Sequence, residues 1–152
     1  MRSMSSLVHK LKVTHPTIAF VEADQFSWSP SQQTVFYNHH QPQAAQLLLH
    51  ELSHALLGHR NYYRDVELVA MESRAWEEAR RYAEMYNVRI QSAVIQDHLD
   101  TYRDWLHARS LCPACSANGY QIQTSEYECP ACFQRWRVND ARLCALRRYQ
   151  LA

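Results

Sequence analysis

Two groups of residues in this chain have the types and spacing of metal ligands. The first is the pentapeptide HELSH at residues 50–54, and the second is a pair of identical CPAC tetrapeptides at 112–115 and 129–132. The 152 residues include 9 His and 5 Cys but only 2 Gly. Imidazole nitrogens and thiolates are the ligands that zinc prefers in proteins. The sequence therefore indicates metal chemistry before any other.

His50 and His54 are four residues apart. On a helix they lie on one face, one turn apart, so both can bind one ion. Two imidazole ligands leave room for a third protein ligand and a water molecule. Glu51 lies about 100° further around the helix, where its carboxylate reaches the water and can act as a general base. The pentapeptide thus predicts a catalytic zinc site with His50 and His54 as ligands and Glu51 as the base.

The third ligand must come from another segment, and residues 65–86 offer one carboxylate in an apolar stripe. Every residue of this stripe lies within about 60° of Glu72 on a helical wheel of about 100° per residue. The stripe consists of Val69, Trp76, Ala79, Ala83 and Tyr86. A carboxylate buried there needs a cation nearby, which zinc on two histidines supplies. Glu72 is therefore the predicted third ligand, and the alternatives are His59, His98 or another glutamate.

Cys112, Cys115, Cys129 and Cys132 form two CxxC pairs separated by residues 116–128. This spacing is typical of four thiolates around one structural zinc ion. The β-prone residues between and after the pairs predict the hairpins of a zinc ribbon. A module this small cannot bury enough apolar surface alone, so we expect zinc to fold it. Cys144 lies outside the set and is expected to be a buried small hydrophobe.

The elements that must position these residues can be predicted from periodicity and from helix-stop residues. Helices are expected over 42–57, 65–86 and 92–109, with Pro42 in a first turn, Gly58 and Asn87 as stops, and a last short helix within 141–151. Strands are expected at 18–21 and 34–37. The prediction is an α+β fold, with a small antiparallel sheet packed on a helical body that carries HExxH. The chain is expected to divide into a first domain at 1–109 and a zinc ribbon with a short tail at 110–152.

Charge and hydropathy exclude some classes of partner. The formal net charge is +1, which gives no strong field for nucleic acid or anionic lipid. No apolar run is long enough for a membrane span, and the first residues do not read as a secretory signal. Paired cysteines that bind metal fit a reducing compartment, so we expect a cytoplasmic protein. The segment 111–152 has only a modest excess of arginine over acidic residues, which favours a protein contact over nucleic acid for the ribbon.

The segment HELSHALLGH, followed by ESRAW at 72–76, resembles the gluzincin type of zinc metallopeptidase, and within it the ImmA/IrrE-like family of short cytoplasmic metallopeptidases. Those proteins have a strand pair before the HExxH helix and a Glu-x-x-Ala motif that supplies the third ligand. The resemblance covers residues 18–86. It implies His50, His54 and Glu72 as zinc ligands, Glu51 as the base, and an intracellular regulatory protein such as a transcriptional repressor as the substrate.

Two features depart from that family. Trp76 stands where such motifs often carry Asp or Asn, and the cysteine module is not a standard part of the family. SprT-like proteases do combine HExxH with a C-terminal zinc ribbon, but their third ligand is a histidine, for which His98 and His107 are available. The expected function is therefore a zinc metallopeptidase with one catalytic and one structural zinc, whose substrate lies along a strand edge near 34–37. The alternatives are a non-catalytic zinc-binding adaptor and a SprT-like, DNA-associated protease whose ribbon contacts protein or nucleic acid.

Overall fold

The computed structural model describes residues 3–141 and 146–152, and backbone contacts divide the chain into two compact units. The first unit contains Met1–Asn61 and Met71–Ile95, and the second contains Tyr62–Ala70 and Gln96–Ala152. The division into compact units does not test the predicted functional domains 1–109 and 110–152, so these domains remain predictions. Cys144, which is expected to be buried, lies outside the described residues.

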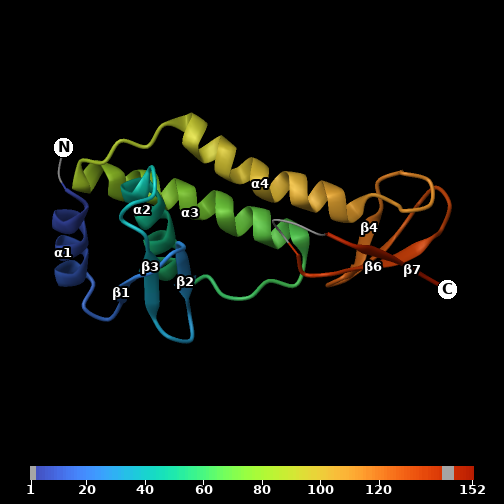
Figure 1. Ribbon diagram of the computed structural model, residues 1–152, viewed down its shortest axis with the longest axis horizontal. Helices are drawn as coiled ribbons and strands as arrows, with labels where there is room; N and C mark the ends of the chain where they lie inside the picture. Colours follow the sequence, from blue (N-terminus) through green and yellow to red (C-terminus); the bar gives the residue numbers. More distant parts are fainter. Residues whose placement is uncertain (1–2, 142–145) are drawn as a thin grey trace. The chain divides into compact units, whose positions relative to one another are not determined.

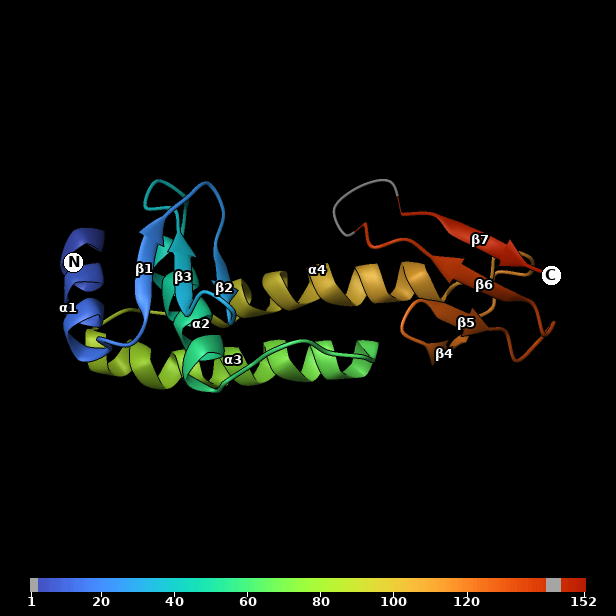
Figure 2. The same cartoon turned by 90° about the horizontal axis from the view of Figure 1, so that it is seen from below.

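The first unit contains a three-stranded sheet of β1 (Ala19–Glu22), β2 (Ser27–Ser29) and β3 (Thr34–Tyr37). The strand order is β1-β3-β2, and β2 and β3 pack on helix α2 (Ala44–Leu56). Figure 2 shows the three strands side by side, with helix α1 (Met4–Thr14) next to β1. The predicted α+β class, a small sheet on a helical body, is confirmed.

Two details of the sheet differ from the expectation. The segments expected to pair antiparallel, now β1 and β3, are parallel, because the intervening β2 takes the antiparallel position beside β3. The second correction concerns the substrate. β3 is the central strand and both of its edges are paired, so the expected substrate edge near 34–37 is wrong. Among the described strands of this sheet, the outer edges belong to β1 and β2.

The helices largely follow the predicted bounds (Figure 1). The structure has α3 at Asp65–Tyr86 and α4 at Ser92–Ser110, and both stop residues adopt left-handed backbone, with φ of 69° at Gly58 and 54° at Asn87. Pro42 is not in a first turn, because α2 begins after a left-handed Gln43 with φ of 62°. Helix α1 was not expected. The Ser3 hydroxyl caps it by accepting from the Ser6 N–H.

The second unit contains one antiparallel sheet in the order β4-β5-β6-β7. Its strands are β4 (Tyr120–Gln123), β5 (Glu126–Glu128), β6 (Arg135–Val138) and β7 (Arg148–Leu151). The expected last helix is wrong where it can be seen, since Arg148–Leu151 pairs with β6 and the ladder hydrogen bonds satisfy its backbone. The core consists of Cys112, Tyr127, Cys129, Trp136 and Val138. A second cluster joins Leu68 of α3 to Tyr102 and Trp105 of α4.

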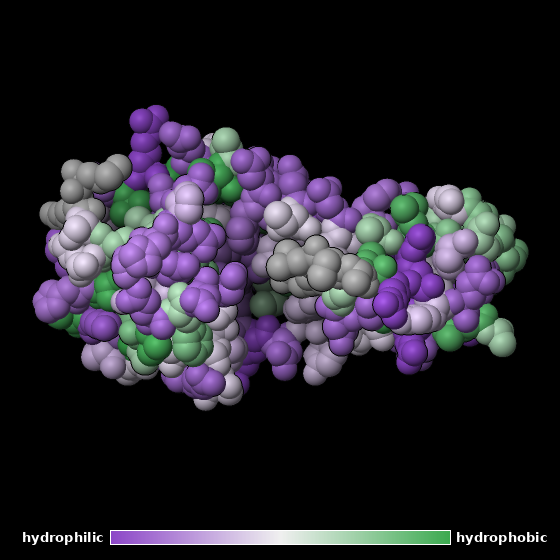
Figure 3. All heavy atoms as spheres, in the orientation of Figure 1, coloured by the Kyte–Doolittle hydropathy of each residue, from purple (hydrophilic) through white to green (hydrophobic). Residues whose placement is uncertain are grey.

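The surface mixes side-chain types. On the face shown in Figure 3, hydrophilic and hydrophobic residues are interspersed over each unit. The most exposed large apolar side chains in the described part of the chain are Phe133, Tyr63 and Val66, each about three-quarters exposed (75%, 74% and 74%). None of the described helices has a stretch long and apolar enough to cross a bilayer.

Candidate metal centres

The first candidate centre joins two ring nitrogens from α2 to one carboxylate from α3. His50 Nε2 lies 2.8 Å from Glu72 Oε2, His54 Nε2 lies 3.4 Å from Glu72 Oε1, and the two Nε2 atoms lie 3.2 Å apart. All three residues are buried, with exposed fractions of 0%, 7% and 6% for His50, His54 and Glu72. The helical wheel therefore identified the carboxylate that meets the HExxH histidines.

The two ring nitrogens and the Glu72 carboxylate are spaced to suit one zinc ion. Neighbouring ligand atoms in a tetrahedron are about 3.3 Å apart when metal–ligand distances are about 2.0–2.1 Å, and the distances between ligand atoms here are 2.8–3.4 Å. Burial alone would raise the pKa of Glu72, but hydrogen bonds and charge from His50 and His54 lower it well below its usual range. Glu72 is thus held as the anion that a cation site requires.

Glu51 stands beside this cluster on the next position of α2. Burial raises the pKa of its carboxyl to about 7; the charge of His54 and a hydrogen bond from the backbone N–H of Trp28 act in the opposite direction, and Glu72 raises it further. A carboxyl whose pKa is near 7 can both take up and return a proton at neutral pH. The contact with Trp28, at the edge strand β2, was missed by sequence reasoning because nothing in the spacing of residues 27–29 marks it.

Trp76 occupies the position at which the family motif often carries a polar residue. Its indole is 1% exposed and stacks on the imidazole of His50, with centroids 4.2 Å apart and planes 22° from parallel. A stacked ring restricts the orientation of His50 by packing. The contact that residue 76 makes with His50 is thus aromatic.

The alternative third ligands are His59, His98, His107 and the other glutamates of α3. Nδ1 of His59 lies 2.9 Å from Nδ1 of His54, on the opposite side of that ring from the Nε2 atom that faces Glu72. His98 and His107 belong to the second unit. The other glutamates of α3 weighed as ligands, Glu67, Glu77 and Glu78, are exposed or partly exposed. Within the first unit, Glu72 is the acidic residue that contacts both histidines.

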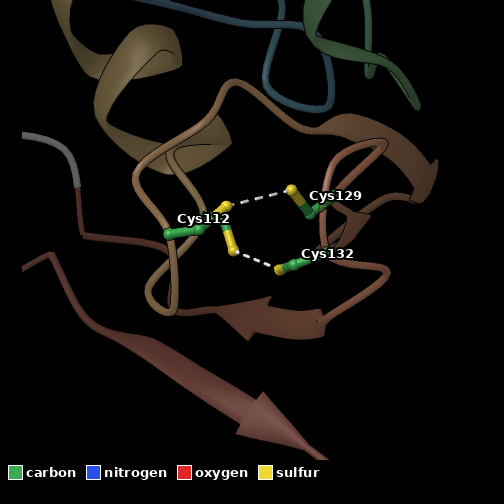
Figure 4. Close-up of side chains that lie close together, drawn as sticks. Cys112, Cys129 and Cys132 are labelled. Atoms are coloured by element: carbon green, nitrogen blue, oxygen red, sulfur yellow. Dashed lines mark hydrogen bonds between the residues drawn. The ribbon is translucent and has the colours of Figure 1, made fainter.

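The second candidate centre is the cluster of Cys112, Cys115, Cys129 and Cys132, whose sulfur atoms lie within 4.8 Å of one another. Figure 4 shows Cys112 facing Cys129 and Cys132, with two sulfur–sulfur contacts marked. The marked contacts are 3.6 Å for Cys112–Cys132 and 3.5 Å for Cys115–Cys129. Tetrahedral zinc with Zn–S of about 2.3 Å places sulfurs about 3.8 Å apart. The four cysteines therefore cluster, as the spacing predicted, at distances that could hold one zinc ion.

The two CxxC loops are local copies of each other. In each loop the backbone N–H two residues after the first cysteine points at its sulfur, Ala114 to Cys112 and Ala131 to Cys129, both at 3.4 Å. The N–H of Cys132 lowers the pKa of Cys129 to about 7, against burial, and the N–H of Ala131 adds to this. Donors around the sulfur favour the thiolate, which is the form that binds zinc. The backbone thus favours the thiolate at the first cysteine of each loop, whereas, against one backbone N–H each, burial and neighbouring thiols raise the pKa of Cys115 and Cys132.

A third cluster lies on the surface of the first unit. The Glu22 carboxylate contacts Nδ1 of His39, and the rings of His39 and His40 lie 3.7 Å apart. These three residues have ligand atoms within 4.8 Å of one another and are all exposed. Exposed groups of this kind occur commonly without a metal. Any metal that this cluster did bind would add to the total found in a binding measurement.

Comparison with known proteins adds no family or homologue. No family model matches this chain, and no curated protein or solved structure matches it. The chemistry of the two centres is therefore inferred from their residues and geometry.

Proposed function

We propose that this chain is a zinc-dependent metallopeptidase of the gluzincin type, similar to the ImmA/IrrE-like family, that cleaves peptide bonds of an intracellular regulatory protein. One observation carries the proposal: His50, His54 and Glu72 converge with distances of 2.8–3.4 Å between ligand atoms, and Glu51 stands beside them. Two histidines and one glutamate are a ligand set typical of catalytic rather than structural zinc. A purely structural site has no use for Glu51.

Each residue of the proposed site has a separate role. His50, His54 and Glu72 would hold the ion, and zinc bound there would supply a Lewis acid for the scissile carbonyl and for the attacking water. Glu51 takes the proton from that water and returns it to the leaving amine. The backbone N–H of Trp28 acts to lower the pKa of Glu51 and so favours its carboxylate, the form that accepts the proton.

The substrate is proposed to lie along β2. This strand pairs with β3 on one side only, and Trp28 stands opposite Val35 in that ladder. The backbone N–H of Trp28 is close enough to Glu51 to act on the pKa of its carboxyl, so β2 at this residue is next to the base. An extended peptide that pairs with this edge would present its main chain to the site, with little demand on side-chain sequence.

The test is the substitution Glu51→Gln, which keeps the size of the side chain but removes the base. Wild-type protein loaded with zinc is expected to cleave a quenched-fluorescent library of short random peptides. Glu51→Gln should lose this cleavage by 10²–10⁴-fold, the usual contribution of a general base, while its zinc content stays unchanged. The exposed Glu77 provides the control, because Glu77→Gln should cleave like the wild type.

Other outcomes favour the alternatives. Cleavage that survives in Glu51→Gln would remove Glu51 as the base. A wild type that holds zinc at both centres yet cleaves no peptide of the library would favour a zinc-binding adaptor. If replacing His98, and not Glu72, reduced zinc content and cleavage, the SprT-like assignment with a third histidine ligand would take its place.

A further inference from the structure

His54 uses its two ring nitrogens for different partners. Nε2 faces the candidate zinc site, 3.2 Å from His50 Nε2 and 3.4 Å from Glu72 Oε1. Nδ1 faces away from it and lies 2.9 Å from Nδ1 of His59. The two rings meet nearly edge to face, with centroids 5.1 Å apart and planes at 60°. This contact between two nitrogens needs one proton between them.

The position of that proton follows from the role of Nε2. A neutral imidazole that binds a metal through Nε2 carries its proton on Nδ1. The Nδ1–H of His54 then donates to His59, whose own Nδ1 must be the unprotonated acceptor. His59 in turn carries its proton on Nε2.

The backbone fixes His59 in this place from both ends. Gly58 adopts left-handed backbone with φ of 69°, which turns the chain so that the His59 N–H donates to the His54 carbonyl at 3.0 Å. The His59 carbonyl accepts from the indole N–H of Trp28 at 3.2 Å. Such a capped turn orients the ring before any metal binds. The backbone of His59 is therefore held in place, and its ring meets His54 Nδ1.

We infer that His59 is a positioning residue: its Nδ1 accepts the hydrogen bond from His54 Nδ1–H and so fixes the tautomer and ring orientation in which His54 Nε2 binds the zinc. The inference rests on the proposed function, since it concerns the same zinc site. Partners of this kind set the orientation and basicity of metal-binding histidines, and their loss typically costs 10–100-fold in metal affinity. Trp28 contacts both Glu51 and His59, so it connects the base to the residue that positions His54.

The first test measures zinc affinity at the HExxH centre in full-length protein whose cysteines already hold zinc, by competition with a chromophoric chelator. His59→Ala should bind zinc 10–100-fold more weakly. His59→Asn should stay within a few-fold of the wild type, because its side-chain oxygen sits on Cγ as Nδ1 does. His39→Ala, which changes an exposed histidine of the same unit, should not change the affinity. An unchanged affinity in His59→Ala, or a loss in His59→Asn as large as in His59→Ala, would overturn the inference.

The second test does not depend on zinc affinity or on peptidase activity. Two-bond nitrogen–proton NMR spectra of the zinc-loaded wild type should show His59 as the Nε2–H tautomer. Finding His59 with its proton on Nδ1 would overturn the inference. A chain that takes up no zinc at the HExxH centre would instead contradict the proposed function, on which the inference rests.

Discussion

Outside the metal centres, Asp65, Arg109 and Tyr127 form a largely buried cluster in the second unit. Asp65 and Arg109 carry its charges. Arg109 is 4% exposed, and its Nη1 lies 3.7 Å from Asp65 Oδ1. Its guanidinium also lies 4.3 Å from the ring centroid of Trp105. The Tyr127 hydroxyl donates to the other oxygen of Asp65. Buried charges are tolerated when paired and hydrogen-bonded, so these contacts join the first turn of α3 to the last turn of α4 and to β5.

Tyr127 makes stability depend on alkaline pH. Burial, and then the hydrogen bond to Asp65, raise the pKa of Tyr127 well above its usual value. A group whose pKa is raised in the folded state stabilises that state below its unfolded pKa of about 10, and the contribution is lost as pH rises through the folded pKa. Tyr127→Phe should therefore lower the free energy of unfolding by about 1–3 kcal/mol at pH 8. Above pH 10 the difference should shrink by about 1.4 kcal/mol per pH unit.

The measurement is urea unfolding of the zinc-loaded wild type and Tyr127→Phe from pH 8 to pH 11, with absorbance at 295 nm to follow tyrosinate. Tyr63→Phe is the matched control, because Tyr63 is 74% exposed and should change neither curve. A gap between wild type and Tyr127→Phe that widens with rising pH would contradict the direction of the pKa shift.

Residues whose role depends on fixed spacing could be predicted from the sequence. His50, His54 and the four cysteines follow from the helical repeat and the two CxxC pairs, and Glu72 follows from its place in an apolar stripe. Trp28 could not be predicted, because a β-strand of three residues brings it to Glu51 from another part of the chain. His59 was visible only as an alternative ligand, since spacing does not tell which side of the His54 ring it meets.

At the scale of elements, Gly119 shows how tightly the ribbon packs. A Cβ there would lie 2.2 Å from Cη2 of Trp136 and 2.9 Å from the carbonyl oxygen of Glu128. Trp136 cannot move away easily, because it is fully buried and its indole donates to the Arg109 carbonyl at 2.9 Å. Gly119→Ala should therefore destabilise the ribbon by about 1–3 kcal/mol through overpacking, and should speed the release of zinc from the cysteines.

Gly58→Ala is the contrasting variant. A Cβ at Gly58 meets nothing within 4 Å, but φ is +69°, so the expected cost is about 1 kcal/mol of backbone strain. Zinc release from the cysteines to a chromophoric chelator should be unchanged by Gly58→Ala and faster in Gly119→Ala. Equal release rates in the two variants would mean that the Trp136 contact does not support the cysteine loops.

Helices were easier to predict than strands. The bounds of α3 match the expectation because Asp65 and Asn87 mark both ends. Helix α1 was missed, although Ser3 as a cap and the apolar spacing of Leu7, Val8 and Leu11 were available signals. The parallel pairing of β1 with β3 and the strand β7 could not be predicted, since the partner of a short strand is decided by distant segments.

At the scale of the whole molecule, the two centres predict two zinc ions per chain. They lie in different compact units, with His50, His54 and Glu72 in the first and the four cysteines in the second. Each unit has its own buried residues, and Cys112 and Cys129 are themselves part of the ribbon core. Loss of one ion should therefore leave the other in place.

Full-length variants separate the two ions. Metal analysis after dialysis should find two zinc ions in the wild type, one in a variant with His50→Ala and His54→Ala, and one in a variant with Cys112→Ser and Cys129→Ser. A variant with His39→Ala and His40→Ala should keep two, which excludes the surface cluster as the source of the second ion. One zinc in the wild type and none in the cysteine variant would mean that the HExxH centre holds no metal, and the adaptor function would then replace the peptidase.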